Sequence, residues 1–469
     1  MPRKPSRSLA VVVMAAGKGK RLKSRLPKTL HPVAGRPVLW HVLRAARAVR
    51  PDRVVVVVSH GRDEVEAAVR SWGGGAVTFV DQGEPLGTGH AVMVAERSVG
   101  KAADVLVLPG DNPLITAAML RDLLRVHRRR KPAATMQSTE LASAKGYGRV
   151  VREGDRLVRI AEERDATPEE RRIREVATSV YVFRRDDLYR ALPLVDRENS
   201  QREYYLPDVL GILAEKGEDL RAVPADFEGA LDVNSRGALA RAAAAMRRRI
   251  NDELMAAGVT LVDPGRTYVD VGVRVGADTI LLPDTYLEGV TRIGTGCTIG
   301  PGARIVDSRV ADGAEITFSV VRGARIGPEA TVGPYASIRP GTVLGRGAKA
   351  GSFVEIKASR IGEGSKVPHL SYVGDATIGR YVNVGAGTIT CNFDGVRKHR
   401  TVIGDGAFIG SDTMLVAPVR VGRGAVTGAG STITRNVPPG ALAVERAEQR
   451  TVKGYAKRRE TGAKNKKEG

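Results

Sequence analysis

Short apolar runs alternate with amphipathic segments over the first 111 residues of the chain. The runs predict strands at 9–14, 54–58, 77–80 and 105–111, and the segments between them predict helices at 35–49, 63–71 and 88–99. Near-continuous valine and leucine runs are typical of strands covered on both faces. Strands that alternate with helices predict a mostly parallel α/β sheet, in which ligands bind at the carboxyl ends of the strands.

A long helical pattern separates this part from the rest of the chain. Arginines occupy most faces of the pattern, and apolar residues recur at helical spacing on the remaining one, at Leu239, Ala243, Met246, Ile250 and Leu254. Gly258 is well placed to end the helix. We therefore predict a first domain over 1–236 and a linker helix over 237–258.

The hydrophobic period changes to six beyond about residue 265. Ile293 and Ile299 begin the period. From Ile326 on, with two steps of five residues and the insertion CNFDGVRKHRTV, an aliphatic or small residue recurs at Ile326, Val332, Ile338, Leu344, Ala350, Ile356, Ile361, Val367, Val373, Ile378, Val384, Thr390, Ile403, Ile409, Leu415, Val421, Thr427 and Ile433. Neither an α-helix nor a flat strand has this period, whereas a coil of three short strands per turn does. The pattern predicts a parallel β-helix over 259–455, a triangular prism with these side chains inside.

Composition agrees with this division and limits the kinds of partner. A chain of 469 residues holds two or three domains, and a narrow prism accounts for an aromatic content of only 4%. The net charge of +22 fits either nucleic-acid binding or polyanionic substrates. Because the cations are spread along the whole chain and not gathered in one patch with aromatics, we favour an enzyme with small anionic substrates and no nucleic-acid partner.

The number of cysteines and the hydropathy of the chain indicate the cellular compartment in which the protein works. The two cysteines, Cys297 and Cys391, cannot form a disulfide framework, which suits a reducing cytoplasm. No apolar stretch reaches membrane-spanning length, so we expect no membrane insertion. The apolar run at 9–14 leads directly into a glycine loop, which favours a strand over a signal peptide. The basic segment 456–469 predicts a disordered tail.

The loop after the first apolar run, AAGKGKRLKSRLPK, concentrates glycines and cations. Gly17 and Gly19 allow a close approach of the backbone to a ligand, and the cations around them are Lys18, Lys20, Arg21 and Lys28. Neither the P-loop spacing nor the dinucleotide-binding pattern fits. Backbone N–H groups where a loop enters a helix favour an anion, so the loop predicts a phosphate site; a solvated basic loop is the alternative.

The whole string resembles the signature of the sugar-phosphate nucleotidylyltransferases. The resemblance implies a Rossmann-like nucleotidylyltransferase domain in which Arg21 and Lys28 hold the phosphates during attack. The segment DQGEPLGTGHA resembles the base-reading segment of this family, and REYYLPD (202–208) matches a further stretch. The implied UTP and UDP-sugar contacts are Ala15, Ala16, Gly17, Lys28, Gln82, Gly87, Thr88, Gly148, Glu162 and Asn234.

Two oxygen-bearing side chains match the metal positions of the same family. Asp111 ends a predicted strand in LPGDNPL, and Asn234 lies in LDVNSR. The resemblance implies that they hold Mg²⁺, with substrate phosphates completing the ligand shell, as suits a hard cation. Taken alone, Asn234 fits the N-cap of a helix equally well.

Residues 351–395 closely resemble the acetyltransferase domain of the bacterial bifunctional N-acetylglucosamine-1-phosphate uridylyltransferase / glucosamine-1-phosphate acetyltransferase family. The resemblance covers about residues 9–455 in the same domain order. It implies that the β-helix is left-handed, that the chain forms homotrimers with the second active site between neighbouring prisms, and that acetyl-CoA binds along the groove. Acetylation of glucosamine 1-phosphate would precede uridylyl transfer from UTP, which would release pyrophosphate.

The residues of the second site fit the chemistry of amine acetylation. His369, in VPHLSY, matches the base position, and histidine is the side chain best suited to deprotonate an amine near neutral pH. Glu355 would orient the base, and the Ala386 N–H would face the developing oxyanion. The implied glucosamine 1-phosphate contacts are Arg339, Lys357, Tyr372, Asn383 and Lys398. The implied acetyl-CoA contacts are Ala386, Asn392, Phe393, Ser411, Ala429 and Arg446.

Three positions depart from the family pattern. Ala177 replaces an asparagine that contacts the sugar, Pro109 replaces a tyrosine, and Phe393 lacks the hydroxyl of a tyrosine. An unpaired sugar hydroxyl costs about 1–3 kcal/mol, so we expect altered affinity for the acceptor in the first site. The alternatives are a monofunctional nucleotidylyltransferase with a structural β-helix and a basic nucleic-acid-binding or scaffold protein. We expect Cys391 to pack at a prism corner, because direct transfer needs no covalent intermediate.

Overall fold

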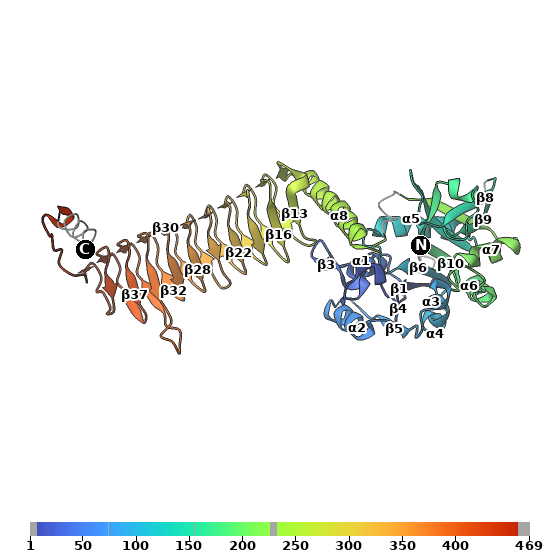
Figure 1. Cartoon of the computed structure of the whole chain (residues 1–469), viewed down its shortest axis with the longest axis horizontal. Coiled ribbons are helices and arrows are strands. Elements are labelled where there is room, and N and C mark those ends of the chain that lie inside the picture. The colour runs from blue at the N-terminus through green and yellow to red at the C-terminus, as the bar shows by residue number, and fades with distance from the viewer. Residues whose placement is uncertain (1–6, 74, 155, 226–231, 458–469) are drawn as a thin grey trace, which may run out of the picture. The chain divides into compact units, whose positions relative to one another are not determined.

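The computed structural model describes residues 7–73, 75–154, 156–225 and 232–457. It divides into two compact units, Met1–Ile250 and Asn251–Gly469, an α/β unit and a coil of stacked strands (Figure 1). The division falls inside helix α8 (Arg236–Ala256). The domain limits drawn from the sequence stay a prediction, and most of the predicted tail at 456–469 lies outside the described residues.

The first unit is built on one sheet with strand order β11-β7-β10-β6-β1-β4-β5, to which the β8–β9 hairpin is attached. Its strands are β1 (Leu9–Met14), β4 (Arg53–Val58), β5 (Thr78–Asp81), β6 (Asp104–Pro109), β7 (Ala134–Glu140), β8 (Arg149–Glu153), β9 (Arg156–Ala161), β10 (Glu175–Arg184) and β11 (Leu220–Pro224). Strands β6, β1, β4 and β5 pair in parallel, and β10 runs antiparallel to both neighbours. The predicted, mostly parallel sheet is confirmed.

Helices cover both faces of this sheet because alternate strand residues point to opposite sides. Val11, Val56 and Leu106 pack on one side and Val12, Val57 and Val107 on the other, all of them buried. Helices α1 (Val38–Ala48), α2 (Arg62–Ser71) and α5 (Ala117–Arg130) cover the first side, and α3 (Thr88–Val94), α4 (Glu96–Val99), α6 (Arg185–Ala191) and α7 (Asp208–Glu215) cover the second. The helix predicted over 88–99 is therefore two short helices.

Helix α8 buries a face that overlaps the predicted apolar stripe only at Met246. Its buried apolar residues are Ala238, Ala242, Ala245 and Met246, whereas Leu239 and Ile250 are only partly covered. Alanines have no side chain beyond the β-carbon, so they allow the closest approach of a helix to its neighbours. Gly258, with a φ of +90°, follows the helix in a conformation that favours glycine. None of the helices in the described parts of the chain has the length and apolarity of a membrane span.

The second unit is a parallel coil with three faces. Its three sheets contain 11, 10 and 9 strands, stacked in the orders β12 to β41, β13 to β40 and β14 to β38. Every position of the predicted six-residue period is buried, from Ile293 at 5% exposure through Ile356 at 0% to Ile433 at 5%. Equivalent residues of successive coils pair directly, as Ile338 does with Ile356. The predicted β-helix is confirmed.

The strands that carry the second candidate site lie on two of these faces. On one face they are β30 (Lys366–His369), β33 (Asn383–Val384), β36 (Phe408–Ile409) and β39 (Val426–Thr427). On the next face they are β25 (Ser337–Ile338), β28 (Glu355–Lys357), β31 (Tyr372–Gly374), β34 (Ile389–Cys391) and β37 (Met414–Val416). Consecutive strands of the chain occupy successive faces, so each face collects residues about 18 positions apart.

Hydroxyl side chains form a second buried series in the prism. Ser359 donates a hydrogen bond to the carbonyl of Lys357 at 2.8 Å and accepts one from the Ala376 N–H at 2.9 Å. Ser365 makes the same kind of link to Gly379 and Val382. A buried hydroxyl that donates and accepts in this way carries little desolvation cost, so the narrow interior tolerates serine and threonine.

The side chains that point into the prism should contribute more to stability than their neighbours in the same strand. Strand β26 (Val343–Leu344) offers a test of this difference. Leu344 is 1% exposed and points into the prism, whereas Val343 is only partly covered. Leu344→Ala should lower the free energy of unfolding by about 2–5 kcal/mol because it leaves a cavity. Val343→Ala should cost well under half of that value. Denaturant unfolding followed by circular dichroism measures both, and equal losses would contradict the assigned orientation.

Candidate functional site

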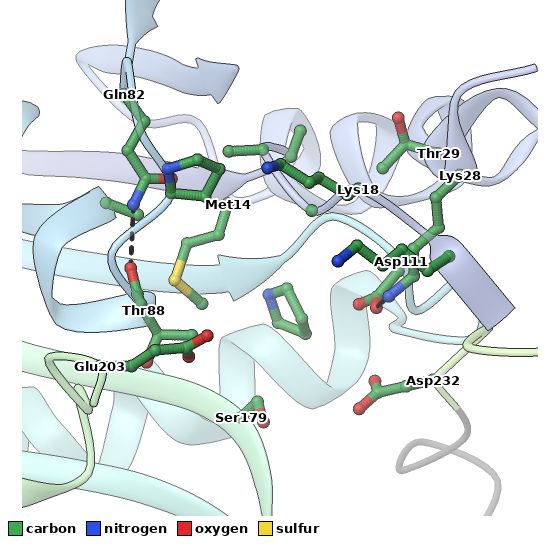
Figure 2. A pocket seen from close by; sticks show the side chains of 18 residues that line it. Met14, Lys18, Lys28, Thr29, Gln82, Thr88, Asp111, Ser179, Glu203 and Asp232 are labelled. Atoms are coloured by element: carbon green, nitrogen blue, oxygen red, sulfur yellow. Dashed lines mark hydrogen bonds and ion pairs between the residues drawn. The ribbon is translucent and has the colours of Figure 1, made fainter. Parts of the chain in front are cut away.

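The first candidate site is a cavity of about 640 Å³ at the carboxyl end of β1 and β6. Figure 2 shows Lys28, Asp111 and Asp232 at one end of it and Gln82, Thr88 and Glu203 at the other. Eight residues predicted from the sequence line it: Ala15, Ala16, Gly17, Lys28, Gln82, Gly87, Thr88 and Asp111. The other predicted residues, Arg21, Gly148, Glu162 and Asn234, are not among its lining.

The glycine loop folds back onto Lys28. Gly19 has a φ of +59°, and a β-carbon on it would lie 2.8 Å from the Lys28 Cβ, so no larger residue fits without displacement. Lys18, Lys20 and Lys28 all line the cavity. Arg21 lies in the short turn Lys20–Leu22 and is exposed. The loop therefore supplies three ammonium groups to one end of the cavity, as an anion site requires.

The opposite end of the cavity is organised by Gln82, Gly87 and Thr88. The Gln82 amide is buried and donates to the Gly87 carbonyl at 2.9 Å. Gly87 has a φ of +109°, and a β-carbon there would lie 2.5 Å from the Tyr204 carbonyl oxygen. Thr88 accepts a hydrogen bond from the Leu206 N–H at 3.0 Å, which ties the predicted segment 202–208 to this wall.

Lys28 brings the two predicted metal ligands together. Its ammonium forms an ion pair with Asp111 and donates to the Asn234 Oδ1 at 2.5 Å. The Val233 N–H also donates to the Asp111 carbonyl at 2.9 Å, so the segment containing Asn234 is fastened to the end of β6. Two oxygen donors thus face one cationic nitrogen. This donor set is one that a hard divalent cation accepts.

Ser179, Glu203 and Asp232 are among the lining residues to which the sequence analysis gave no role. Ser179 lies in β10, where the pairing with β7 is irregular, and has a φ of +59°. Asp232 stands two positions before Asn234, within the quoted LDVNSR, but nothing in the local pattern showed that it faces the cavity. Burial, and then the nearby Asp111 carboxylate, raise the pKa of Asp232 well above its usual range, and Lys28 opposes the shift.

Gly148, Glu162 and Ala177 meet beside β8 and β10. The Ala177 N–H donates to the Gly148 carbonyl at 2.9 Å, and a β-carbon on Gly148 would lie 3.3 Å from the Glu162 Oε1. Burial, followed by the Asp208 and Asp165 carboxylates, raises the pKa of Glu162 to about 7. A carboxyl that still carries its proton near neutral pH can donate as well as accept a hydrogen bond, which suits a hydroxyl-rich ligand.

The second candidate site follows one corner of the prism. His369 ends β30 and is exposed, and Ala386, Ser411 and Ala429 occupy the equivalent turn after β33, β36 and β39. Backbone hydrogen bonds link these turns, from Asp412 to the Ala386 carbonyl at 2.6 Å and from Gly430 to the Ser411 carbonyl at 2.8 Å. Arg446 donates to the Ala429 carbonyl at 3.0 Å. Three of the predicted acetyl-CoA residues, Ala386, Ser411 and Ala429, therefore form a column of small side chains along the prism.

The adjacent face gathers cations around Asp375. Lys357 lies 3.6 Å from the Asp375 carboxylate, and the Asn392 amide donates to it at 2.5 Å. Lys357 also lowers the pKa of the Lys398 ammonium, since the two like charges lie close together. The Tyr372 hydroxyl and the Asn392 amide both lie over the Gly374 α-carbon, within 2.5 and 2.7 Å of where a β-carbon would be.

Other predicted residues of the second site surround this group. Arg339 forms a 2.6 Å ion pair with Glu355, and Asn383 pairs with Lys366 in the register of β30 and β33. The insertion folds back on itself through a bridge between Phe393 and Lys398, and the Asp394 carboxylate lies 2.6 Å from the His399 Nε2. Burial raises the pKa of the partly covered Cys391 thiol, which makes it a poorer nucleophile.

Glu162 and its neighbour Glu163 predict opposite pH effects on stability. The folded state keeps the Glu162 proton up to a pKa of about 7, against 4.5 for an unperturbed glutamate, so this carboxyl lowers stability as pH rises through that window. The Gly146 N–H and the Arg149 guanidinium lower the pKa of Glu163 against the effect of burial, so its charge stabilises the fold above its pKa.

At pH 8, Glu162→Gln should therefore raise the melting temperature, and Glu163→Gln should lower it. At pH 5 the gain from Glu162→Gln should largely disappear, because the native carboxyl is then protonated. Thermal unfolding of the three proteins at both pH values measures these shifts. A loss of stability in Glu162→Gln at pH 8 would show that the carboxylate is paired and not isolated.

Comparison with known proteins finds relatives of both units. Residues 11–194 match the model of the MobA-like NTP transferase domain, and residues 400–435 match that of the bacterial transferase hexapeptide (six repeats), which is consistent with a left-handed β-helix. The chain is 49% identical over 448 residues to the bifunctional protein GlmU of Carboxydothermus hydrogenoformans, covering 95% of this chain and 99% of that one. It is 46% identical to the bifunctional protein GlmU of Streptomyces avermitilis, covering 97% and 96%. With this identity over almost the full length of both proteins, the chain belongs to the GlmU family of bifunctional proteins.

Proposed function

We propose that this chain catalyses two consecutive steps in the synthesis of UDP-N-acetylglucosamine. The β-helix acetylates glucosamine 1-phosphate with acetyl-CoA, and the α/β unit then transfers UMP from UTP to the product, releasing pyrophosphate. The observation that carries the proposal is that one chain contains both a lysine-lined cavity at the end of a parallel sheet and an exposed histidine beside a cluster of cations on a hexapeptide coil.

In the uridylyl transfer, a phosphate oxygen of the sugar attacks the α-phosphorus of UTP. A new P–O bond forms as the bond to pyrophosphate breaks, and the protein contributes no nucleophile. Lys18, Lys20 and Lys28 neutralise the charge that develops on the phosphates, and Arg21 approaches from the adjoining turn. Gln82 presents a fixed amide to the edge of the uracil base.

Asp111 and Asn234 would hold Mg²⁺ at the phosphate end of the cavity. The Lys28 ammonium contacts the oxygens of both residues, which supports a cation at this position. When bound, Mg²⁺ supplies a double positive charge to the phosphates. Lys28 would then be free to turn from the two oxygens towards the triphosphate.

In the acetyl transfer, His369 accepts a proton from the attacking amine. The amine adds to the thioester carbonyl, and the C–S bond breaks to release coenzyme A as its thiol. Arg339, Lys357, Tyr372 and Lys398 hold the sugar phosphate, with Asp375 orienting Lys357 and Asn392. The small side chains of Ala386, Ser411 and Ala429 leave space for the elongated coenzyme along the corner, and the Ala386 N–H faces the oxyanion.

The acceptor preference of the first site is where this chain should differ from its relatives. Ala177 is buried and has no amide to offer a sugar, and Pro109 lines the cavity without a hydroxyl. Ser179 lines the same cavity as Pro109, and the Glu162 carboxyl group lies beside Gly148, whose carbonyl accepts a hydrogen bond from the Ala177 N–H. We propose a working uridylyltransferase with altered affinity for N-acetylglucosamine 1-phosphate. Two unpaired cysteines and nucleotide substrates support a cytoplasmic location.

A column of exposed apolar side chains supports assembly into a homotrimer. Phe318, Tyr335, Phe353 and Leu370 occupy one prism corner on successive coils and are 44–63% exposed in the single chain. The rings of Phe318, Tyr335 and Phe353 stack at centroid distances of 5.7 and 5.3 Å. The column ends beside His369, at the coil where the small-residue column begins. Exposed apolar surface of this kind is typical of an interface, and a neighbouring prism would also close the second site.

A paired assay tests the two reactions separately. His369→Ala should lower acetyl transfer by about 10²–10⁴-fold, because the base is lost, and leave pyrophosphate release from UTP unchanged. Free-thiol and pyrophosphate assays with several sugar 1-phosphates measure both. Cys391→Ala serves as the control and should keep both activities. Pyrophosphate release without any thiol release by the wild type would favour the monofunctional alternative, and salt-sensitive RNA binding without turnover would favour the nucleic-acid-binding one.

The apolar column predicts the assembly state. The double variant Tyr335→Ser, Phe353→Ser should convert trimers to smaller species, because it removes the two central rings of the column. Tyr381→Ser, which changes an equally exposed tyrosine (65%) at another turn, should remain trimeric. Sedimentation equilibrium gives the mass of each protein. A trimeric double variant would place the contact elsewhere, and a monomeric wild type would refute trimer formation.

A further inference from the structure

Asp232 is a polar side chain at the first site that the mechanism above does not use. It lines the cavity at the same end as Lys28 and Asp111 (Figure 2). Its Oδ1 atom is buried and has no hydrogen-bond partner among the residues that the structure describes. Burying a carboxylate oxygen without a hydrogen-bond partner costs free energy of folding. A bound ligand from outside the protein would remove that cost.

The backbone holds Asp232 close to the proposed metal ligands. The Asn234 N–H donates to the Asp232 carbonyl at 3.1 Å, and the Val233 N–H donates to the Asp111 carbonyl at 2.9 Å. The first bond closes a turn within the segment 232–234, and the second fastens this segment to the residues that follow β6. Asp111 and Asp232 therefore belong to one site and not to separate surfaces.

Lys28 forms an ion pair with only one of the two carboxyl groups at its end of the cavity. One ammonium group serves the Asp111 carboxylate and the Asn234 amide oxygen, and the second carboxylate, that of Asp232, stands in the same end of the cavity. Among the described residues, Lys28 is thus paired with the Asp111 carboxylate, and the Asp232 Oδ1 is left without a hydrogen-bond partner. A divalent cation would neutralise both carboxylates and accept all three oxygens, which are the hard ligands that Mg²⁺ and Mn²⁺ prefer.

We propose that Asp232 is a third oxygen ligand of the divalent cation, together with Asp111 and Asn234. This inference rests on the proposed nucleotidyl transfer, since that reaction is the reason for a cation at this position. Three protein oxygens, two of them charged, hold the cation before UTP arrives. Lys28 is displaced from between Asp111 and Asn234 and becomes available to the triphosphate.

Cation binding to the full chain without nucleotide tests the inference. Mn²⁺, a paramagnetic substitute for Mg²⁺, is titrated and the free ion is measured by electron paramagnetic resonance. Asp232→Asn should weaken Mn²⁺ binding about tenfold or more, and Asp111→Asn should do so as well. Asp219→Asn is the matched control, because Asp219 lies in the same unit as an exposed partner of Arg221, and its binding should equal that of the wild type.

The outcomes separate this inference from the proposed function. Unchanged Mn²⁺ affinity in Asp232→Asn, with a loss in Asp111→Asn, would refute a ligand role for Asp232 and leave the uridylyl transfer intact. A wild type that binds no Mn²⁺ without nucleotide would also refute it. If the wild type binds Mn²⁺ but releases no pyrophosphate from UTP, the proposed function fails while the ligand assignment stands.

Thermal unfolding provides a second readout that does not depend on activity. In EDTA, Asp232→Asn should melt at the wild-type temperature or above it, because the substitution removes a buried charge without a partner and keeps the shape of the side chain. This result also shows that the variant folds. Added Mg²⁺ should raise the melting temperature of the wild type more than that of Asp232→Asn. Equal increments would count against the proposal.

Discussion

Parallel pairing of strands is the constraint on which both units depend. Parallel strands bring their equivalent ends to the same edge, so residues far apart in the sequence become neighbours there. In the first unit this pairing sets Met14 opposite Pro109 and brings the glycine loop and Asp111 to one cavity. In the prism it sets Ser352 opposite His369, and the same corner then continues through Ala386, Ser411 and Ala429. Each site is therefore a consequence of sheet register and not of a local motif.

The two sites use the same electrostatic device. A carboxylate contacts a lysine that is proposed to bind phosphate: Asp111 contacts Lys28 in the first unit, and Asp375 contacts Lys357 in the second. Such a pair orients the ammonium group and limits the repulsion among neighbouring cations. It also means that a phosphate competes with an acidic side chain for each lysine. A metal ion that occupies the acidic side chains would shift this competition towards the phosphate in the first site.

The chain is strongly basic, yet its charge is mostly dispersed. Many arginines form exposed ion pairs along the surface, as Arg304 does with Glu288 and Arg380 with Asp405, and such pairs contribute little stability. The concentrations of positive charge that matter for function are small and lie at strand ends and turns. The net charge of +22 thus describes the surface of the protein more than it describes either site.

The sequence by itself determined which residues are buried and in what repeating geometry. Alternating valines predicted the two-faced sheet, and the six-residue period predicted the inward positions of the prism, because hydrophobic burial acts on a local, regular pattern. The sequence also identified most of the glycine-loop residues that line the first cavity, together with Gln82 and Asp111. Only the tertiary structure decided that Lys28 joins Asp111 to Asn234, that Asp232 and Ser179 face the cavity, and that burial raises the pKa of Glu162. Contacts of this kind join groups far apart in the sequence, as Lys28 and Asn234 are at a separation of 206 positions, and no local period encodes which of them will meet.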